Sequence, residues 1–143
     1  MPNEIVTEMV HFTGTELSCN CGCGLVGLTQ HFADKVEYAR EKAGVAFVVR
    51  SSRRCDYWNT LQGGKGNSEH LWGDALDVEA KDSFTRWKIV KAAIDAGIRR
   101  IGIGATFVHL GDGLQYSPYP VIWNYAFAGA VAKEAEDLDG IDS

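Results

Sequence analysis

Residues 67–80, NSEHLWGDALDVEA, hold a histidine and an aspartate seven residues apart, His70 and Asp77. Asp77 stands just before Val78 in an otherwise apolar run, where a buried carboxylate is costly unless something compensates its charge. A second histidine, His109, lies late in another apolar segment. Two imidazoles and one carboxylate form a good three-ligand set for zinc and leave a fourth position open for water. The H-x6-D spacing alone is a weak signal, because a histidine after a Gly-rich loop is more often a hydrogen-bonding loop residue.

Two helices are expected to flank the segment that carries these residues. Apolar residues at helical spacing over residues 25–43 predict the first helix, which Gly44 would end. Residues 83–96 predict the second helix, with Ser83 as its N-cap and Gly97 as its C-terminal stop.

Short apolar runs predict the strands. Residues 45–49 indicate a buried strand, and residues 51–67, rich in Ser, Arg, Gly and Asn, indicate a loop. Alternation over residues 75–80 places Asp77 on one face of a second strand, with Leu, Val and Ala on the other face. Two more strands, RIGIG and TFVHL, follow the second helix. This order of elements predicts an α+β fold, with a small antiparallel sheet and flanking helices.

Size and charge narrow the class of protein. The 143 residues allow one domain with a real core, and the net charge of −5 argues against a nucleic-acid binder. The basic cluster of Arg50, Arg53 and Arg54 is too short for that role and suits a small anion such as a carboxylate. No run approaches the length of a membrane span, and the N-terminus lacks the apolar core of a signal peptide. We therefore expect a monomer made in the cytoplasm, without membrane insertion.

Four cysteines form a second group of possible ligands. Cys19, Cys21 and Cys23 lie in CNCGCG, and Cys55 stands apart. Cysteines two residues apart cannot easily pair, so the pattern does not indicate a secreted disulfide framework. A structural metal site with Cys55 or His31 as fourth ligand is one interpretation, although C-x-C-x-C is not the usual C-x-x-C of a zinc knuckle. Reduced, partly buried thiols are favoured over that site.

The wider context of these residues resembles one enzyme family. NSEHLWGDALDV is similar to the S-x-H-x-x-G-x-A-x-D signature of the zinc D-alanyl-D-alanine carboxypeptidase family, with matches at Ser68, His70, Gly73, Ala75 and Asp77. GIGATFVHL resembles the late strand that carries the family's third ligand. HFTGTELSCNCGCG resembles its opening, VVRSSRRCDYWN its arginine segment, and VIWNY the ending common in phage-type members. The resemblance covers roughly residues 11–125.

The resemblance implies a zinc-dependent peptidase with a fold like that of hedgehog and lysostaphin. His70, Asp77 and His109 would be the zinc ligands. The substrate would be peptidoglycan peptides, cut in the stem or the cross-link by an endolysin or a D,D-carboxypeptidase. Such an enzyme acts in the cell wall or periplasm after release, in the host cell if it is phage-encoded. Residues 1–125 would form the single peptidase domain, and residues 126–143 an acidic tail that is frayed or disordered.

The family also implies a substrate-binding arginine after the first strand. Arg54 fits that position, because SSRR aligns with S-G-x-R, and Arg53 is the fallback. A guanidinium there would hold a peptide carboxylate through two hydrogen bonds. Ser68 and Asn59 would shape the same loop, and Gln62 could donate a hydrogen bond to the substrate.

The general base is the least determined residue. Some family members have a histidine two residues before the last ligand, or an acid three residues before it, where this chain has Phe107 and Thr106. Many members continue with H-(V/L)-D, whereas HLGDG places Asp112 one position late. Asp112 is the first candidate for the base, with a structural role in a Gly-Asp-Gly turn as the rival. Glu69 and Asp74 are weaker candidates.

Two other functions stay open. A cell-wall-binding module could keep the metal and the fold without hydrolysing anything, and the unassigned base leaves room for it. A non-enzymatic virion or cell-surface component, with structural cysteines and histidines, is the other. Loss of turbidity of bacterial walls, with and without a chelator, would separate the enzyme from both.

Overall fold

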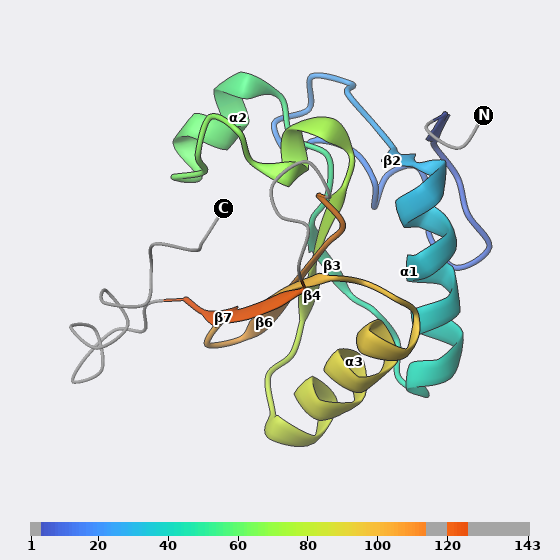
Figure 1. The fold of residues 1–143 in the computed structure, drawn as a ribbon. Coiled ribbons are helices and arrows are strands. Elements are labelled where there is room, and N and C mark those ends of the chain that lie inside the picture. Colours follow the sequence, from blue (N-terminus) through green and yellow to red (C-terminus); the bar gives the residue numbers. More distant parts are fainter. Residues whose placement is uncertain (1–3, 114–119, 126–143) are drawn as a thin grey trace.

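The computed structural model describes residues 4–113 and 120–125, and its centre is a five-stranded sheet with the order β3-β4-β6-β5-β7 (Figure 1). The strands of this sheet are β3 (Val49–Ser51), β4 (Ala75–Glu79), β5 (Arg100–Ile103), β6 (Phe107–Gly111) and β7 (Val121–Asn124). A small separate sheet pairs β1 (Ile5–Val6) with β2 (Leu28–Thr29). The helices are α1 (Gln30–Ala43), α2 (Asp56–Leu61) and α3 (Ser83–Asp95), with a short 3-10 helix, η1 (Glu69–Trp72).

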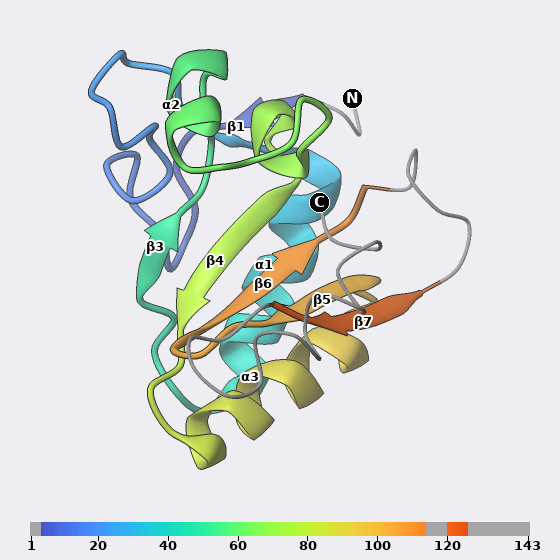
Figure 2. The same ribbon diagram turned by 90° about the vertical axis from the view of Figure 1, so that its left-hand side faces the viewer.

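Helices α1 and α3 lie together on one face of the large sheet (Figure 2). Side chains alternate along a strand, so Leu76 and Val78 of β4, with Val108 and Leu110 of β6, point toward the helices and are fully buried. They pack against apolar residues that recur along the helices, among them Phe32, Val36, Ile89 and Ala93. The intervening residues of both strands, which include the predicted ligands Asp77 and His109, therefore point to the other face.

The structure confirms the predicted α+β fold with a small antiparallel sheet and flanking helices. Neighbours among β3, β4, β6 and β5 run antiparallel, and β7 adds to β5 as a parallel edge strand. The three strands predicted after residue 74 form as β4, β5 and β6. The predicted acidic tail, residues 126–143, lies outside the described residues, so the domain boundary at residue 125 stays a prediction.

Both predicted helices form, but their first turns differ from the prediction. The first helix begins at Gln30 and not near residue 25, because Thr29 pairs with β1 and caps the helix through its side chain. The prediction that Ser83 is the N-cap of the second helix is wrong. Asp82 is the cap, since its carboxylate accepts a 2.7 Å hydrogen bond from the backbone N–H of Thr85.

The segment before the site departs further from the sequence prediction. The strand predicted over 45–49 begins only at the last of these residues, because Phe47 turns its ring into the core against Phe12. The loop predicted over 51–67 contains helix α2. Its cap is Cys55, a residue outside the usual set of N-caps, so composition gave no signal for this helix.

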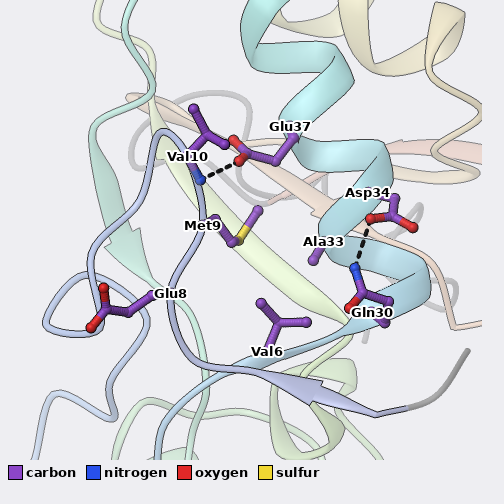
Figure 3. A pocket seen from close by; sticks show the side chains of 8 residues that line it. All are labelled: Val6, Glu8, Met9, Val10, Gln30, Ala33, Asp34 and Glu37. Atoms are coloured by element: carbon purple, nitrogen blue, oxygen red, sulfur yellow. Dashed lines mark hydrogen bonds between the residues drawn. The ribbon is translucent and has the colours of Figure 1, made fainter. Parts of the chain in front are cut away.

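A hollow lies between the N-terminal segment and α1 (Figure 3). One rim is held by the backbone N–H of Val10, which donates to the carboxylate of Glu37. In α1, Gln30 donates to Asp34 over 2.7 Å. None of the predicted site residues lines this hollow in the described part of the chain. Within the same part, no helix combines the length and the apolar character that crossing a bilayer requires.

Candidate metal centre and active-site pocket

The three predicted ligands meet on the face of the sheet that turns away from α1 and α3. Asp77 of β4 and His109 of β6 are direct partners in the strand register, and their Oδ1 and Nδ1 atoms are 2.9 Å apart. His70, from η1 just before β4, brings Nε2 to 3.4 Å from Asp77 Oδ2. One possible ligand atom from each residue lies within 4.8 Å of the others. The arrangement can thus hold one metal ion.

The second nitrogen of each imidazole is held by an oxygen behind it. His70 Nδ1 is 2.7 Å from the carbonyl oxygen of Ser52, which can only accept, so this nitrogen carries the proton. His109 Nε2 is 2.7 Å from a carboxylate oxygen of Glu69. These contacts leave His70 Nε2 and His109 Nδ1 turned toward Asp77. Oxygen acceptors behind histidine ligands are the usual outer shell of a protein metal site.

The charges of the cluster also fit a bound cation. Burial would raise the pKa of Asp77, but attraction to His70 and hydrogen bonds from the two histidines outweigh it and lower that pKa. Burial would lower the pKa of His109, yet its hydrogen bonds to Asp77 and Glu69 raise it to about 9. Without metal, a proton on His109 therefore holds the two carboxylates together. A divalent cation can replace that proton, as metal binding to histidine requires.

Glu69 supports His109 from the side away from the other ligands. It is fully buried, it accepts a 2.7 Å hydrogen bond from the N–H of Gly113, and Arg100 Nε lies 3.1 Å from it. Burial opposes its ionisation, but the hydrogen bond from His109 and the charge of Arg100 lower its pKa. A Cβ on Gly111 would lie 2.2 Å from this carboxylate, so only glycine fits there. Glu69 is therefore placed to orient a ligand and not to act as a base.

Arg54 lies at the edge of the cluster. Its Nη2 is 3.6 Å from Asp77 Oδ2, while its other nitrogens donate to Ser51 Oγ over 3.1 Å and to Asn59 Oδ1 over 3.2 Å. Its backbone N–H donates to the carbonyl of His70 over 3.0 Å, which ties the arginine segment to η1. These contacts fix a guanidinium beside the candidate metal site.

A pocket opens over Asp77 and His70. Its described lining comprises Arg54, Gln62, Gly63, Gly64, His70, Asp77, Phe107 and Tyr125. Two of the predicted substrate-binding residues, Arg54 and Gln62, are thus in its wall. No binding role was predicted for the two aromatic residues of this lining, Phe107 and Tyr125, although Tyr125 belongs to the VIWNY motif.

The other two predicted substrate-binding residues lie behind this wall. Asn59 is buried, accepts from Arg54, and donates a 2.8 Å hydrogen bond to the carbonyl of Lys65. Ser68 is fully buried, and its hydroxyl caps η1 by accepting from the N–H of His70 over 3.3 Å. Both residues therefore hold the loop from behind the described lining of the pocket, and a role for them in binding substrate stays a prediction.

The rest of the basic cluster points elsewhere. Arg53 Nε donates to the carbonyl of Leu71 over 3.2 Å, and Arg50 donates to Thr106 Oγ1 over 2.8 Å and pairs with Glu79. Of the three arginines, Arg54 is the one in the wall of the pocket. This geometry favours Arg54 over its fallback as the group that holds a carboxylate.

The structure does not bring Asp112 to the cluster. Strand alternation sends residue 109 to the site and residue 112 to the opposite face. There the buried carboxylate of Asp112 lies 3.0 Å from Lys35 Nζ and pairs with His31, both on α1. Asp74, the weaker candidate, accepts a 2.6 Å hydrogen bond from Thr29. The geometry thus supports the rival, structural role for Asp112.

Comparison with known protein families identifies the family to which the chain belongs. Residues 10–111 match the family described as Peptidase M15. A search among curated proteins found no match. The matched segment includes all three candidate ligands and covers well over half of the 143 residues. The chain therefore belongs to the peptidase M15 family, the zinc D-alanyl-D-alanine carboxypeptidase family that its motifs resemble.

Proposed function

We propose that this protein is a zinc peptidase that hydrolyses peptide bonds in the stem or cross-link of bacterial peptidoglycan. The observation that carries the proposal is the paired orientation of the two histidines. Each turns one nitrogen toward Asp77, while an oxygen of Ser52 or Glu69 accepts from the other nitrogen. Membership of the peptidase M15 family supports the same activity.

The donor set fits zinc. His70, Asp77 and His109 would hold the ion through two nitrogens and one oxygen, and three protein ligands leave a position open, as in catalytic zinc sites. Zinc bound there supplies Lewis-acid activation of water and of the scissile carbonyl. The oxygens of Ser52 and Glu69 keep both rings in the orientation that presents the ligand nitrogens.

Arg54 is the proposed anchor for the substrate. Stem peptides carry free carboxylates, and a planar guanidinium can hold a carboxylate through two parallel hydrogen bonds. Asn59 and Ser51 hold Arg54 against the pocket, so little side-chain freedom is lost when substrate binds. Gln62 adds an amide to the same wall, and Phe107 adds an apolar surface for the peptide's methyl groups.

The carboxylates predicted as general bases are held away from the reacting position. Glu69 and Asp112, which the sequence offered as bases, are engaged with His109 and with α1. Tyr125 lines the same pocket as Arg54, and its ring centroid lies 5.2 Å from that of Phe107. We propose that the Tyr125 phenol assists by donating a hydrogen bond to the reacting amide.

One observation favours a second function, that of a module that binds the cell wall without hydrolysing it. Because the predicted bases are engaged elsewhere, a wall-binding module with the same metal site and no hydrolysis would have this geometry too. Such a module would bind zinc and peptidoglycan and release no product.

The test is to incubate zinc-loaded protein with purified peptidoglycan and with defined stem peptides, and to identify the products by mass spectrometry. A D,D-carboxypeptidase releases free D-alanine, whereas an endopeptidase opens cross-links or stems and releases none. The controls are a chelated sample, His70→Ala, and His11→Ala, which removes a histidine that pairs with Glu37 outside the site. Binding without any product in the wild type would establish the module and rule out the enzyme.

A further inference from the structure

Four cysteines from two distant segments form a second cluster. Cys19 and Cys21 come from the N-terminal segment, and their sulfurs are 3.5 Å apart. Cys55, which begins α2, lies 3.7 Å from Cys19 and 3.6 Å from Cys21, measured between the sulfurs. The sulfur of Cys23 lies within 4.8 Å of the other three. His31, the other possible ligand named from the sequence, pairs with Asp112 instead.

These separations have the size of one face of a tetrahedral zinc site. Zinc–sulfur bonds of about 2.3 Å in a tetrahedron place neighbouring sulfurs roughly 3.8 Å apart. A disulfide would instead join two of the sulfurs at about 2.05 Å and leave the others apart. Here three sulfurs are nearly equidistant, which is the pattern of a shared ion and not of a pair.

The backbone around the cluster is arranged to support thiolates. The N–H of Cys55 points to the sulfur of Cys19 over 3.4 Å, and the N–H of Trp58 points to the sulfur of Cys55 over the same distance. A tight turn at Gly22, with a φ of 84°, brings Cys21 and Cys23 around Cys19. N–H groups directed at ligand sulfurs are a common outer shell of metal–thiolate sites.

We propose that Cys19, Cys21, Cys23 and Cys55 bind a second, structural zinc ion. Four thiolates fill a tetrahedral shell and leave no open position, so this ion would not take part in hydrolysis. Soft thiolate ligands in tetrahedral geometry select zinc over the harder divalent cations. This proposal does not rest on the proposed peptidase activity.

The proposed ion would fasten the N-terminal segment to one wall of the active-site pocket. Cys55 directly follows Arg54, and the helix that it caps carries Asn59, which holds the Arg54 side chain. A hydrogen bond also joins the N-terminal segment to the arginine segment, since the Asn20 side chain donates to the carbonyl of Arg50 over 2.9 Å. Loss of the cysteine-bound ion should therefore loosen the arginine wall while leaving His70 and its partners in place.

The test is a metal analysis of the whole chain, purified under reducing conditions. We expect about two zinc ions per wild-type chain and about one in His70→Ala, where the thiolate site remains. After exchange with Co²⁺, both proteins should show sulfur-to-cobalt charge-transfer absorption, which histidine and carboxylate ligands do not give. Cys21→Ser should weaken this absorption and the affinity for the ion, because three thiolates remain, and His11→Ala should keep both ions.

The wild-type and His70→Ala measurements decide the matter even if the cysteine variant fails to fold. The proposal is overturned if the wild type holds a single zinc that His70→Ala abolishes, or if cobalt-loaded protein lacks thiolate absorption. A disulfide among these four cysteines in freshly purified protein would overturn it as well. None of these results depends on activity, so failure of this site and failure of the peptidase proposal can be told apart.

Discussion

The histidine cluster and the cysteine cluster are positioned by different means. Asp77 and His109 are paired in the register of two central strands, over a core that α1 and α3 bury. The cysteines lie on a turn and at the start of a short helix, away from the ladder of the large sheet. The first cluster offers three ligands beside a pocket, and the second offers four. A three-ligand metal site on rigid strands leaves one coordination position open, as catalytic sites do. A closed set of four thiolates suits a structural ion that links two loops.

The largest effect should follow from changes to the histidine cluster itself. Replacing Asp77 or His109 with alanine should remove one zinc ion and reduce cleavage to background, because the described residues offer three protein ligands at this cluster and each is needed. The core residues lie on the other face of the sheet, so the fold should persist. Elemental analysis, circular dichroism and the peptidoglycan assay measure the three outcomes. A variant with full zinc content and the wild-type rate would exclude the residue as a ligand.

Arg54→Ala tests the wall that both clusters share. The variant should lower kcat/KM on stem peptides with a free carboxylate by about 10- to 100-fold, since it removes charge-assisted hydrogen bonds. Both zinc ions should stay bound. Arg53→Ala is the matched control, because its guanidinium turns to the carbonyl of Leu71. Equal effects of the two substitutions would remove the assignment of Arg54.

Glu69→Gln tests the support behind His109. The amide can still accept from the ring, but the charge that pairs with Arg100 is lost, so zinc affinity should fall by about 10- to 100-fold. Competition with a fluorescent zinc chelator measures this change. Glu79→Gln is the control, because Glu79 lies on the same strand as Asp77 and pairs with Arg50 outside the cluster. Unchanged affinity in Glu69→Gln would mean that the carboxylate does not tune the ligand.

The pH dependence of stability should differ between metal-free and zinc-loaded protein. In metal-free protein the pKa of His109 is raised from 6.5 to about 9. The stabilisation by its proton is therefore complete below pH 6.5 and is lost as the pH rises through about 9. The free energy of unfolding of the metal-free protein should therefore fall by on the order of 3 kcal/mol over this pH range. Zinc replaces the proton, so the zinc-loaded protein should not show this loss in urea titrations between these pH values.

Asp112→Asn should have the smallest effect on chemistry. Turnover per zinc-loaded, folded molecule should stay within about twofold, while stability falls by about 1–3 kcal/mol because the buried contacts to Lys35 and His31 weaken. Lys35→Met should destabilise the fold in the same way. A drop in turnover of 100-fold or more, at unchanged stability, would restore Asp112 as the general base.

Much of the fold followed from local patterns. The helices at residues 30–43 and 83–95 and the strands that carry Asp77 and His109 have clear apolar periodicity, and the structure contains all of them. The short strand β3 and helix α2 lack such periodicity. Their formation depends on the packing of Phe47 and on a cysteine cap, which sequence spacing does not reveal.

The candidate site was predictable only where a motif carried it. His70, Asp77 and His109 meet as their motifs indicate. Glu69 lies 40 residues before His109 in the sequence, and the two come into contact because η1 leads into β4, which pairs with β6. The placement of Asp112 could have been foreseen, because an offset of three residues along a strand reverses the face. The cysteine spacing favoured unliganded thiols, and only the three-dimensional approach of Cys55 changes that interpretation.

The central claim is that an ion at the histidine cluster makes the protein a peptidase. The most direct measurement is a zinc titration of chelated protein, with peptide-bond cleavage followed as a function of the zinc bound. We expect cleavage to rise in proportion to the ion bound at His70, Asp77 and His109, to saturate when that cluster is full, and to stay at background in His70→Ala. Cleavage that persists in fully chelated protein, or an equal rate in His70→Ala, would contradict the account.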